Sequence, residues 1–132
     1  LTFRSSCFCG NCIFEVREST PIFRIRCHCS VCQTFSGADS LAIAAFPGKD
    51  VYMIQGKHDV TQSSPILNRH RCSDCGTPTY NSPVSKEIDF VAFPLATLQR
   101  DATTKKVDPK VRAALQPVVH IHYEMRYEDA TD

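Results

Sequence analysis

The sequence predicts a mainly β fold with one short helix, in a single domain that spans residues 1–132. Three observations support this prediction. Short apolar or alternating runs, separated by turn residues, recur along the chain. One stretch alone carries the signals of a helix. Hydrophobic residues make up 42% of the chain and charged residues 22%, which is ordinary for a globular protein.

The first well-marked strand is predicted in the sequence PIFRIRC. Apolar and charged positions alternate in it as Phe23, Arg24, Ile25, Arg26 and Cys27. Further runs at 40–46, 51–56 and 88–93 have the composition of strands. Pro47 and Gly48 separate the first two of these runs and indicate a turn.

The late stretch of residues 119–127 also alternates. Its apolar positions are Val119, Ile121, Tyr123, Met125 and Tyr127. Its polar positions are His120, His122, Glu124 and Arg126. This period of two predicts a strand with one apolar and one polar face.

The helix is predicted over residues 108–115. Asp108 can cap its first turn, and Pro109 suits its first position. A short apolar stripe is formed by Val111, Ala114 and Leu115. Pro117 then ends the helix because proline cannot continue the backbone hydrogen bonds.

Charge and hydropathy argue against several classes of partner. The formal net charge is +1 and no dense run of Lys or Arg occurs. We therefore expect neither nucleic acid nor an acidic membrane as the main partner. No apolar run approaches the ~20 residues of a membrane-spanning helix. Since no signal peptide is visible either, we expect a cytoplasmic protein.

The eight cysteines are a high count for 132 residues. They form three tight clusters: Cys7, Cys9 and Cys12; Cys27, Cys29 and Cys32; Cys72 and Cys75. Disulfide frameworks usually spread their cysteines along the chain, whereas C-x-C and C-x-x-C spacings suit several thiolates on one ion. We expect zinc rather than four disulfides, and with it a reducing compartment.

The sequence CSDCGTP has the chemistry of a zinc knuckle. Cys72 and Cys75 can bind one ion, and Gly76 lets the chain turn so that backbone N–H groups point at sulfur. A closed tetrahedral site needs two more ligands, for which Cys7 and Cys9 are the natural donors. Such a site could contribute on the order of 10 kcal/mol to folding.

That allocation leaves Cys27, Cys29 and Cys32, which supply three corners of a tetrahedron. An open fourth corner is typical of a catalytic zinc. Two alternatives remain open: Cys12 or a histidine could close this site, or Cys12 could replace a ligand of the first site. Counting favours Cys12 as a spare thiol that ligates neither metal and packs as a small hydrophobe.

Four segments together carry a family resemblance: CFCGNCIFEV, CHCSVCQTFSGA, RHRCSDCGTPTY and PVVHIHYEMRYED. From about residue 3 to residue 127, the chain resembles the glutathione-dependent formaldehyde-activating enzyme and centromere protein V family. The resemblance implies a mainly β fold, the β-tent. It implies a structural zinc on Cys7, Cys9, Cys72 and Cys75. It also implies a second, exchangeable or catalytic zinc on Cys27, Cys29 and Cys32. Cys12 and Arg71 depart from the usual pattern, which leaves the substrate open.

Other polar residues are weaker candidates for the second site. Arg24 and Arg26 could hold a substrate carboxylate such as glutathione offers, but a solvated strand face is the plainer account. We expect the sequence TFSGAD to form a loop over the three cysteines. Its candidate contacts are Ser36, Gly37 and Asp39.

The histidines also have two interpretations each. His120 and His122 could bind metal, although exposed histidines on a strand face are commoner. His28 lies between two predicted ligands; alternation points it away from them, but it could line the substrate entrance. His70 could support the knuckle from beside it.

These observations favour a carbon–sulfur lyase with Cys27, Cys29 and Cys32 as its catalytic residues. Zinc would lower the pKa of a bound thiol, and the expected substrate is a small thiol such as glutathione. The family name implies formation of S-hydroxymethylglutathione from formaldehyde. The alternative is a non-catalytic binding module in which both zincs are structural, as centromere protein V suggests. The nearly neutral charge favours the enzyme.

Overall fold

The computed structural model of the chain describes residues 1–131 and confirms a mainly β fold. The strands are β1 (Phe3–Ser6), β2 (Ile13–Val16), β3 (Phe23–Cys27), β4 (Leu41–Phe46), β5 (Val51–Gln55), β6 (His58–Gln62), β7 (Leu67–Cys72), β8 (Pro78–Pro83), β9 (Val91–Pro94) and β10 (Val119–Ile121). The helices are α1 (Ser30–Ser36) and α2 (Pro109–Ala114), with single 3₁₀ turns at η1 (Gly48–Asp50), η2 (Leu95–Thr97) and η3 (Tyr123–Met125).

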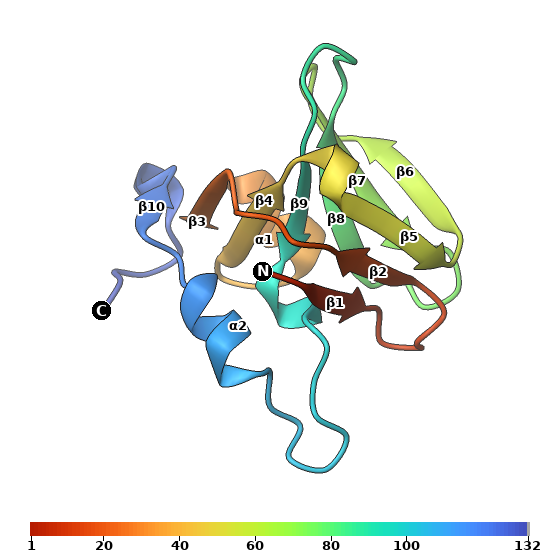
Figure 1. The fold of residues 1–132 in the computed structure, drawn as a ribbon. Coiled ribbons are helices and arrows are strands. Elements are labelled where there is room, and N and C mark those ends of the chain that lie inside the picture. The colour runs from red at the N-terminus through yellow and green to blue at the C-terminus, as the bar shows by residue number, and fades with distance from the viewer. Residues whose placement is uncertain (132) are drawn as a thin grey trace.

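The strands form two sheets (Figure 1). A three-stranded sheet has the order β1-β2-β5, and a seven-stranded sheet has the order β10-β3-β4-β9-β8-β7-β6. Neighbouring strands are antiparallel except for β3 and β10, which run parallel. Among residues 1–131, no helix has the length and apolar character needed to cross a membrane.

The strands predicted over residues 21–27, 40–46 and 51–56 are confirmed as β3, β4 and β5. The run from 88 to 93 becomes a strand only at β9, because a turn precedes it in which the Ile88 N–H donates to the Ser85 carbonyl. No prediction covered β6, β7 and β8, whose residues are mostly polar.

The strand predicted over residues 119–127 is wrong beyond Ile121. His122 takes a left-handed backbone with φ of 51°, which ends the strand because an extended chain cannot pass through that conformation. The following residues form η3, and Tyr123 packs against the ring of His28 with centroids 5.1 Å apart. The expected apolar face of five residues therefore does not form.

The predicted helix is confirmed as α2. A carboxylate oxygen of Asp108 accepts from the N–H groups of Lys110 and Val111, Pro109 opens the helix, and Leu115 is fully buried. These contacts fasten the short helix at both ends.

A second helix, α1, was not predicted, since the sequence TFSGAD was expected to be a loop. The sulfur of Cys29 caps this helix by accepting from the Cys32 N–H at 3.2 Å, and Gly37 ends it with φ of 71°. A cysteine is not a usual helix cap, so the start of α1 carried no ordinary signal.

Strand β4 is buried on both faces. Ala44 and Phe46 belong to the main core, which draws residues from both sheets. That core consists of Phe3, Phe14, Val16, Ala44, Phe46, Phe93, Leu98 and Leu115. Ile43 and Ala45 belong to a second cluster, which also contains two cysteines. The second cluster consists of Cys27, Cys32, Ile43, Ala45 and Ala92. The other face of the large sheet therefore supports a cysteine site.

Candidate metal centres

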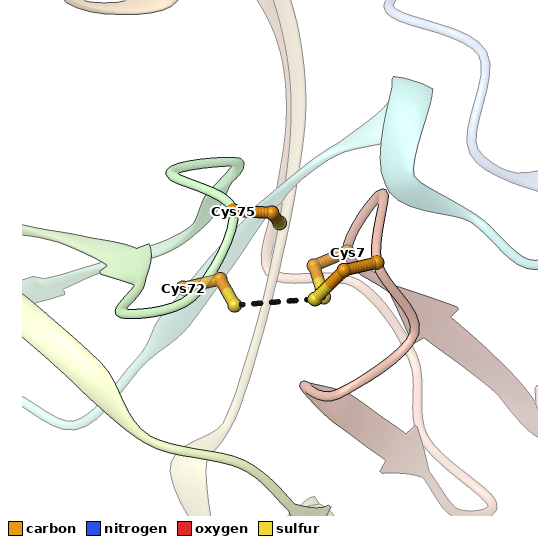
Figure 2. Close-up of side chains that lie close together, drawn as sticks. Cys7, Cys72 and Cys75 are labelled. Atoms are coloured by element: carbon orange, nitrogen blue, oxygen red, sulfur yellow. Dashed lines mark hydrogen bonds between the residues drawn. The ribbon is translucent and has the colours of Figure 1, made fainter.

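Four cysteines from two distant segments meet at one end of the molecule. Cys7 and Cys9 lie in the loop after β1, while Cys72 ends β7 and Cys75 follows in the turn to β8. Figure 2 shows Cys72 and Cys75 on one loop, facing Cys7 on the other. All four sulfurs lie within 4.8 Å of one another.

The spacing of these sulfurs suits a tetrahedral ion. The sulfurs of Cys7 and Cys9 are 3.5 Å apart, and those of Cys9 and Cys72 are 3.8 Å apart. Zn–S bonds of about 2.3 Å place tetrahedral sulfurs about 3.8 Å apart. The structure thus brings together the predicted set of four, and these residues could hold a metal ion.

The knuckle turn is held by backbone geometry. Gly76 has a φ of 78°, and its N–H donates to the Cys72 carbonyl at 2.9 Å. Partial burial opposes ionisation of Cys75, but hydrogen bonds with Thr77 and Cys9 together outweigh it and lower the pKa of this thiol to about 6. The turn therefore favours a thiolate at that corner.

Cys12 lies beside the site without joining it. Its side chain is 1% exposed, and its thiol donates to the Lys57 carbonyl at 3.3 Å. Its backbone N–H donates to the Cys7 sulfur at 3.2 Å. Burial raises the pKa of Cys12 to about 12. These contacts suit a neutral thiol that supports the loop, so the spare role of Cys12 stays a prediction.

The second group contains Cys27, Cys29 and Cys32, which also lie within 4.8 Å of one another. Cys27 ends β3, and the other two flank the first turn of α1. Cys27 and Cys32 are buried, and Cys29 is half-buried. Within residues 1–131, no histidine, carboxylate or further cysteine completes the group. The alternative in which Cys12 or a histidine closes this site is therefore absent from the structure.

Arg69 is buried against this group, with 4% of its side chain exposed. Its Nη2 donates to the Cys32 sulfur at 3.4 Å, and its Nε donates to Ser63 Oγ at 3.1 Å. A hydrogen bond from Cys27, and then the Arg69 guanidinium, lower the pKa of Cys32. The hydrogen bond to Cys32, and then burial, raise the pKa of Cys27. A fixed positive charge thus favours an anionic sulfur at this corner.

Sequence reasoning missed Arg69. The signal available was a charged residue three positions before Cys72, in a run where arginines alternate with His70. The neighbouring Arg71 stacks on Phe35 at 4.0 Å and donates to the Gly76 carbonyl. Charged residues next to a knuckle can therefore be structural parts of the site rather than a solvated face.

A pocket of about 300 Å³ opens beside the three cysteines and is lined by all of them. Its apolar walls include Phe23, Ile25, Ile43, Leu67, Phe90 and Ile121. Ser63, Asn81 and Arg69 supply polar groups, and the exposed His122 lies at its edge. The side of the group without a protein ligand thus faces a cavity that a small molecule could enter.

Arg24 and Arg26 do not line this pocket. Arg24 donates to the Ala114 carbonyl at 3.0 Å, and Arg26 donates to Ser40 Oγ at 3.1 Å. Both side chains point away from the cysteine face of β3, as alternation requires. A role for them at the open side of the second site is not supported.

The predicted contacts in TFSGAD are also placed elsewhere. Ser36 donates to the Cys32 carbonyl within α1, and Gly37 and Asp39 follow the helix end. None of the three lines the pocket beside the cysteines.

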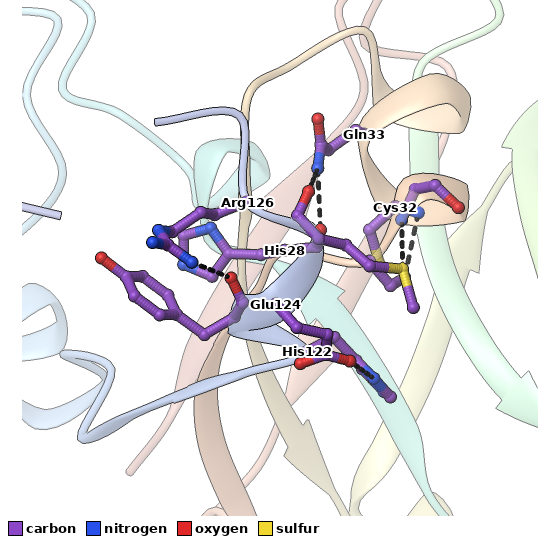
Figure 3. A network of polar contacts seen from close by, with 10 residues as sticks. His28, Cys32, Gln33, His122, Glu124 and Arg126 are labelled. Atoms are coloured by element: carbon purple, nitrogen blue, oxygen red, sulfur yellow. Dashed lines mark hydrogen bonds and ion pairs between the residues drawn. The ribbon is translucent and has the colours of Figure 1, made fainter. Parts of the chain in front are cut away.

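His28 is buried and turned away from the three sulfurs. Its Nε2 lies 2.8 Å from Nδ1 of His120. Gln33 fastens this region by donating to the carbonyls of His28, at 2.7 Å, and Met125, at 2.8 Å (Figure 3). His122 is instead near a carboxylate: its Nδ1 lies 3.6 Å from Oε1 of Glu124. The predicted pair of histidines on one strand face is therefore divided between two environments.

His70 does not touch the knuckle sulfurs by hydrogen bond. Its ring stacks on Tyr80 with centroids 3.8 Å apart, and its Nε2 lies 2.8 Å from Ser82 Oγ. Burial lowers the pKa of His70 to about 4, so the ring is neutral at physiological pH. It is a core residue of the sheet.

Comparison with known proteins identifies the family. None of the curated proteins compared with the chain matches it. A crystal structure of a Rhodobacter sphaeroides protein has a TM-score of 0.62 and 20% sequence identity, covering 89% of this chain and 98% of that chain. This likeness shows a shared fold. Residues 2–124 match the family model described as "Glutathione-dependent formaldehyde-activating enzyme". The chain therefore belongs to the family of glutathione-dependent formaldehyde-activating enzymes.

Proposed function

We propose that the protein is a zinc-dependent enzyme of the carbon–sulfur lyase type, acting on an adduct of glutathione or a similar thiol. One observation carries this proposal: three cysteine sulfurs converge, and their open side faces a pocket rather than a fourth ligand among residues 1–131. Family membership supports glutathione-related chemistry. A second group of four cysteines is complete by itself, so the two groups suit different tasks.

The donor sets fit zinc. Four thiolates make a closed structural site, and three leave one position for a small molecule. In this proposal the structural ligands are Cys7, Cys9, Cys72 and Cys75. The ligands of the catalytic ion are Cys27, Cys29 and Cys32. Zinc held there would lower the pKa of a bound thiol and so make its thiolate available at neutral pH.

The protein residues prepare the site for an anionic sulfur. Arg69 offsets the negative charge that three thiolates leave on a dication, and its burial beside Cys32 makes this effect stronger than at a surface. The apolar walls make the surroundings of the sulfurs less polar than bulk water, which strengthens electrostatic interactions there. Cys27 and Cys32 are held by strand and helix backbone, which fixes their separation.

The proposed reaction balances without an oxidant or reductant. In the forward direction the thiol sulfur forms a bond to an aldehyde carbon, and the carbonyl π bond breaks. The thiol proton ends on the former carbonyl oxygen, which becomes a hydroxyl group. The reverse reaction breaks the same carbon–sulfur bond and releases thiol and aldehyde. With formaldehyde and glutathione, the adduct is S-hydroxymethylglutathione.

An exchange experiment tests this function. ¹³C-labelled formaldehyde is mixed with a thiol, and NMR exchange spectroscopy measures the rate at which the adduct forms and breaks. The zinc-loaded protein should accelerate exchange, and Cys29→Ser should abolish the acceleration. Cys12→Ala is the matched control because it removes a buried cysteine that belongs to neither group. Equal rates with and without protein, for glutathione and for simpler thiols, would contradict the proposal.

A further inference from the structure

We infer that the group that enters the pocket beside Cys27, Cys29 and Cys32 is an apolar aryl or branched alkyl body, attached close to the sulfur of the substrate. This inference rests on the proposed function of the same site and narrows its substrate class. Charged peptide portions, such as those of glutathione, would lie outside the pocket.

The first argument is the strand alternation in β3. Phe23, Ile25 and Cys27 all line the pocket. The two arginines between them lie on the opposite face, where Arg24 bonds to the Ala114 carbonyl and Arg26 to Ser40. The strand that supplies a cysteine therefore also supplies an apolar floor, and a substrate bound at the sulfurs must lie against it.

The second argument is the construction of the far wall. Phe90 meets Phe23 edge to face, with ring centroids 5.8 Å apart and an interplanar angle of 74°. Ile43 on β4 and Ala92 on β9 also line the pocket, and both are buried. Two rings held in this geometry present the kind of surface on which an aromatic or branched aliphatic group packs well.

The third argument is charge. Among the described residues that line the pocket, Arg69 is the one with a fixed charge, and it already bonds to Cys32 and Ser63. No aspartate, glutamate or lysine among residues 1–131 lines it. Glutathione carries two carboxylates and an ammonium group, and burying these groups without partners is unfavourable. The pocket volume of about 300 Å³ is at the lower end of the range for small-molecule sites.

Isothermal titration of the zinc-loaded protein tests the inference. The probes are 2-phenylethanethiol, 2-mercaptoethanol and glutathione. The phenyl compound should bind about tenfold or more tightly than 2-mercaptoethanol, because it buries a ring. Ile66→Glu should remove most of that advantage, since Ile66 lies at the pocket rim and is 76% exposed. Ile88→Glu is the matched control, at an exposed isoleucine outside the pocket.

A second measurement separates this inference from the proposed function. Ethylbenzene lacks sulfur, and its binding is followed by methyl NMR of Ile25, Ile43 and Leu67. We expect these signals to shift saturably in the wild-type protein and less in Ile66→Glu. If ethylbenzene binds but no thiol does, the apolar pocket stands and the thiol function fails. If the three thiols bind equally and Ile66→Glu changes none of them, the inference is overturned while the thiol function stands. Unshifted methyl signals would also overturn it.

Discussion

The guanidinium of Arg69 lies 3.4 Å from the sulfur of Cys32, and both side chains are buried. The contact joins β7 to α1 across 37 positions of sequence. A buried cation needs a partner, and here the partner is a sulfur of the proposed catalytic group. The pair therefore links the electrostatics of the second cysteine group to the strand that leads into the first.

Arg69→Gln should weaken zinc binding at the second group by about tenfold or more, because a supporting positive charge is lost. The four-cysteine group should keep its zinc. Competition with a graded series of chelators measures both affinities. Arg71→Gln is the control, since Arg71 stacks on Phe35 and bonds to backbone rather than to sulfur. If the two variants lose equal zinc affinity at the second group, Arg69 has no special role there.

Substitutions in the two cysteine groups should have different consequences. Cys72→Ser should lower the thermal midpoint strongly, because it leaves a closed site one ligand short and that site fastens two distant segments. Cys29→Ser should give a folded protein without catalytic activity. Circular dichroism melts compare the two variants. If Cys29→Ser unfolds as readily as Cys72→Ser, the second group is structural.

Cys12→Ala should retain two zinc ions per chain and most of the activity. The substitution removes a buried thiol from beside Gly56 and costs on the order of 1 kcal/mol of stability, but it removes no ligand. Elemental analysis after gel filtration gives the metal content. A variant with one zinc would place Cys12 among the ligands.

Stability should fall below pH 6.5, in part because of His58. Burial lowers the pKa of His58 from its ordinary value of 6.5, and its Nε2 has no hydrogen-bond partner among residues 1–131. The unfolded chain therefore takes up a proton first as pH falls, so stability is lost from about 6.5 downward until the folded form is protonated too.

His58→Gln should reduce this dependence on pH. Urea unfolding measures the stability of the wild-type and variant proteins above and below pH 6.5. Because both proteins lose zinc alike at low pH, the difference between them reports the contribution of His58. Identical losses of unfolding free energy would show that His58 does not contribute.

Alternation and ligand spacing made much of the fold and both cysteine groups predictable. The strand β3 could be predicted because its apolar and charged faces are cleanly separated. The grouping of the cysteines could be predicted because each tight cluster spans only a few residues of sequence, and the number of ligands that zinc takes then favours one allocation. Cys7 and Cys9 are the natural partners to expect for Cys72 and Cys75, whereas the spare role of Cys12 rests on counting.

Other features depend on contacts that no local pattern reveals. The helix α1 begins at a cysteine sulfur instead of an ordinary cap. The strand β7 contains Arg69 and His70, whose burial depends on Cys32, Ser63 and Tyr80 from other elements. The pocket arises only when β3, β4 and β9 lie side by side. Tertiary pairing, rather than propensity, sets the last two, whereas the cap of α1 is a local contact made by an unusual residue type.

The optical spectrum of the cobalt-substituted protein tests the central claim, that Cys27, Cys29 and Cys32 hold a metal with one position open to a thiol. Glutathione or 2-phenylethanethiol should change the spectrum saturably, and Cys32→Ser should abolish the change. Binding should weaken as pH falls, because protons compete for the thiolate, and S-methyl analogues should bind far more weakly. A spectrum that no thiol alters would contradict the account, since it would mean that the fourth position is closed.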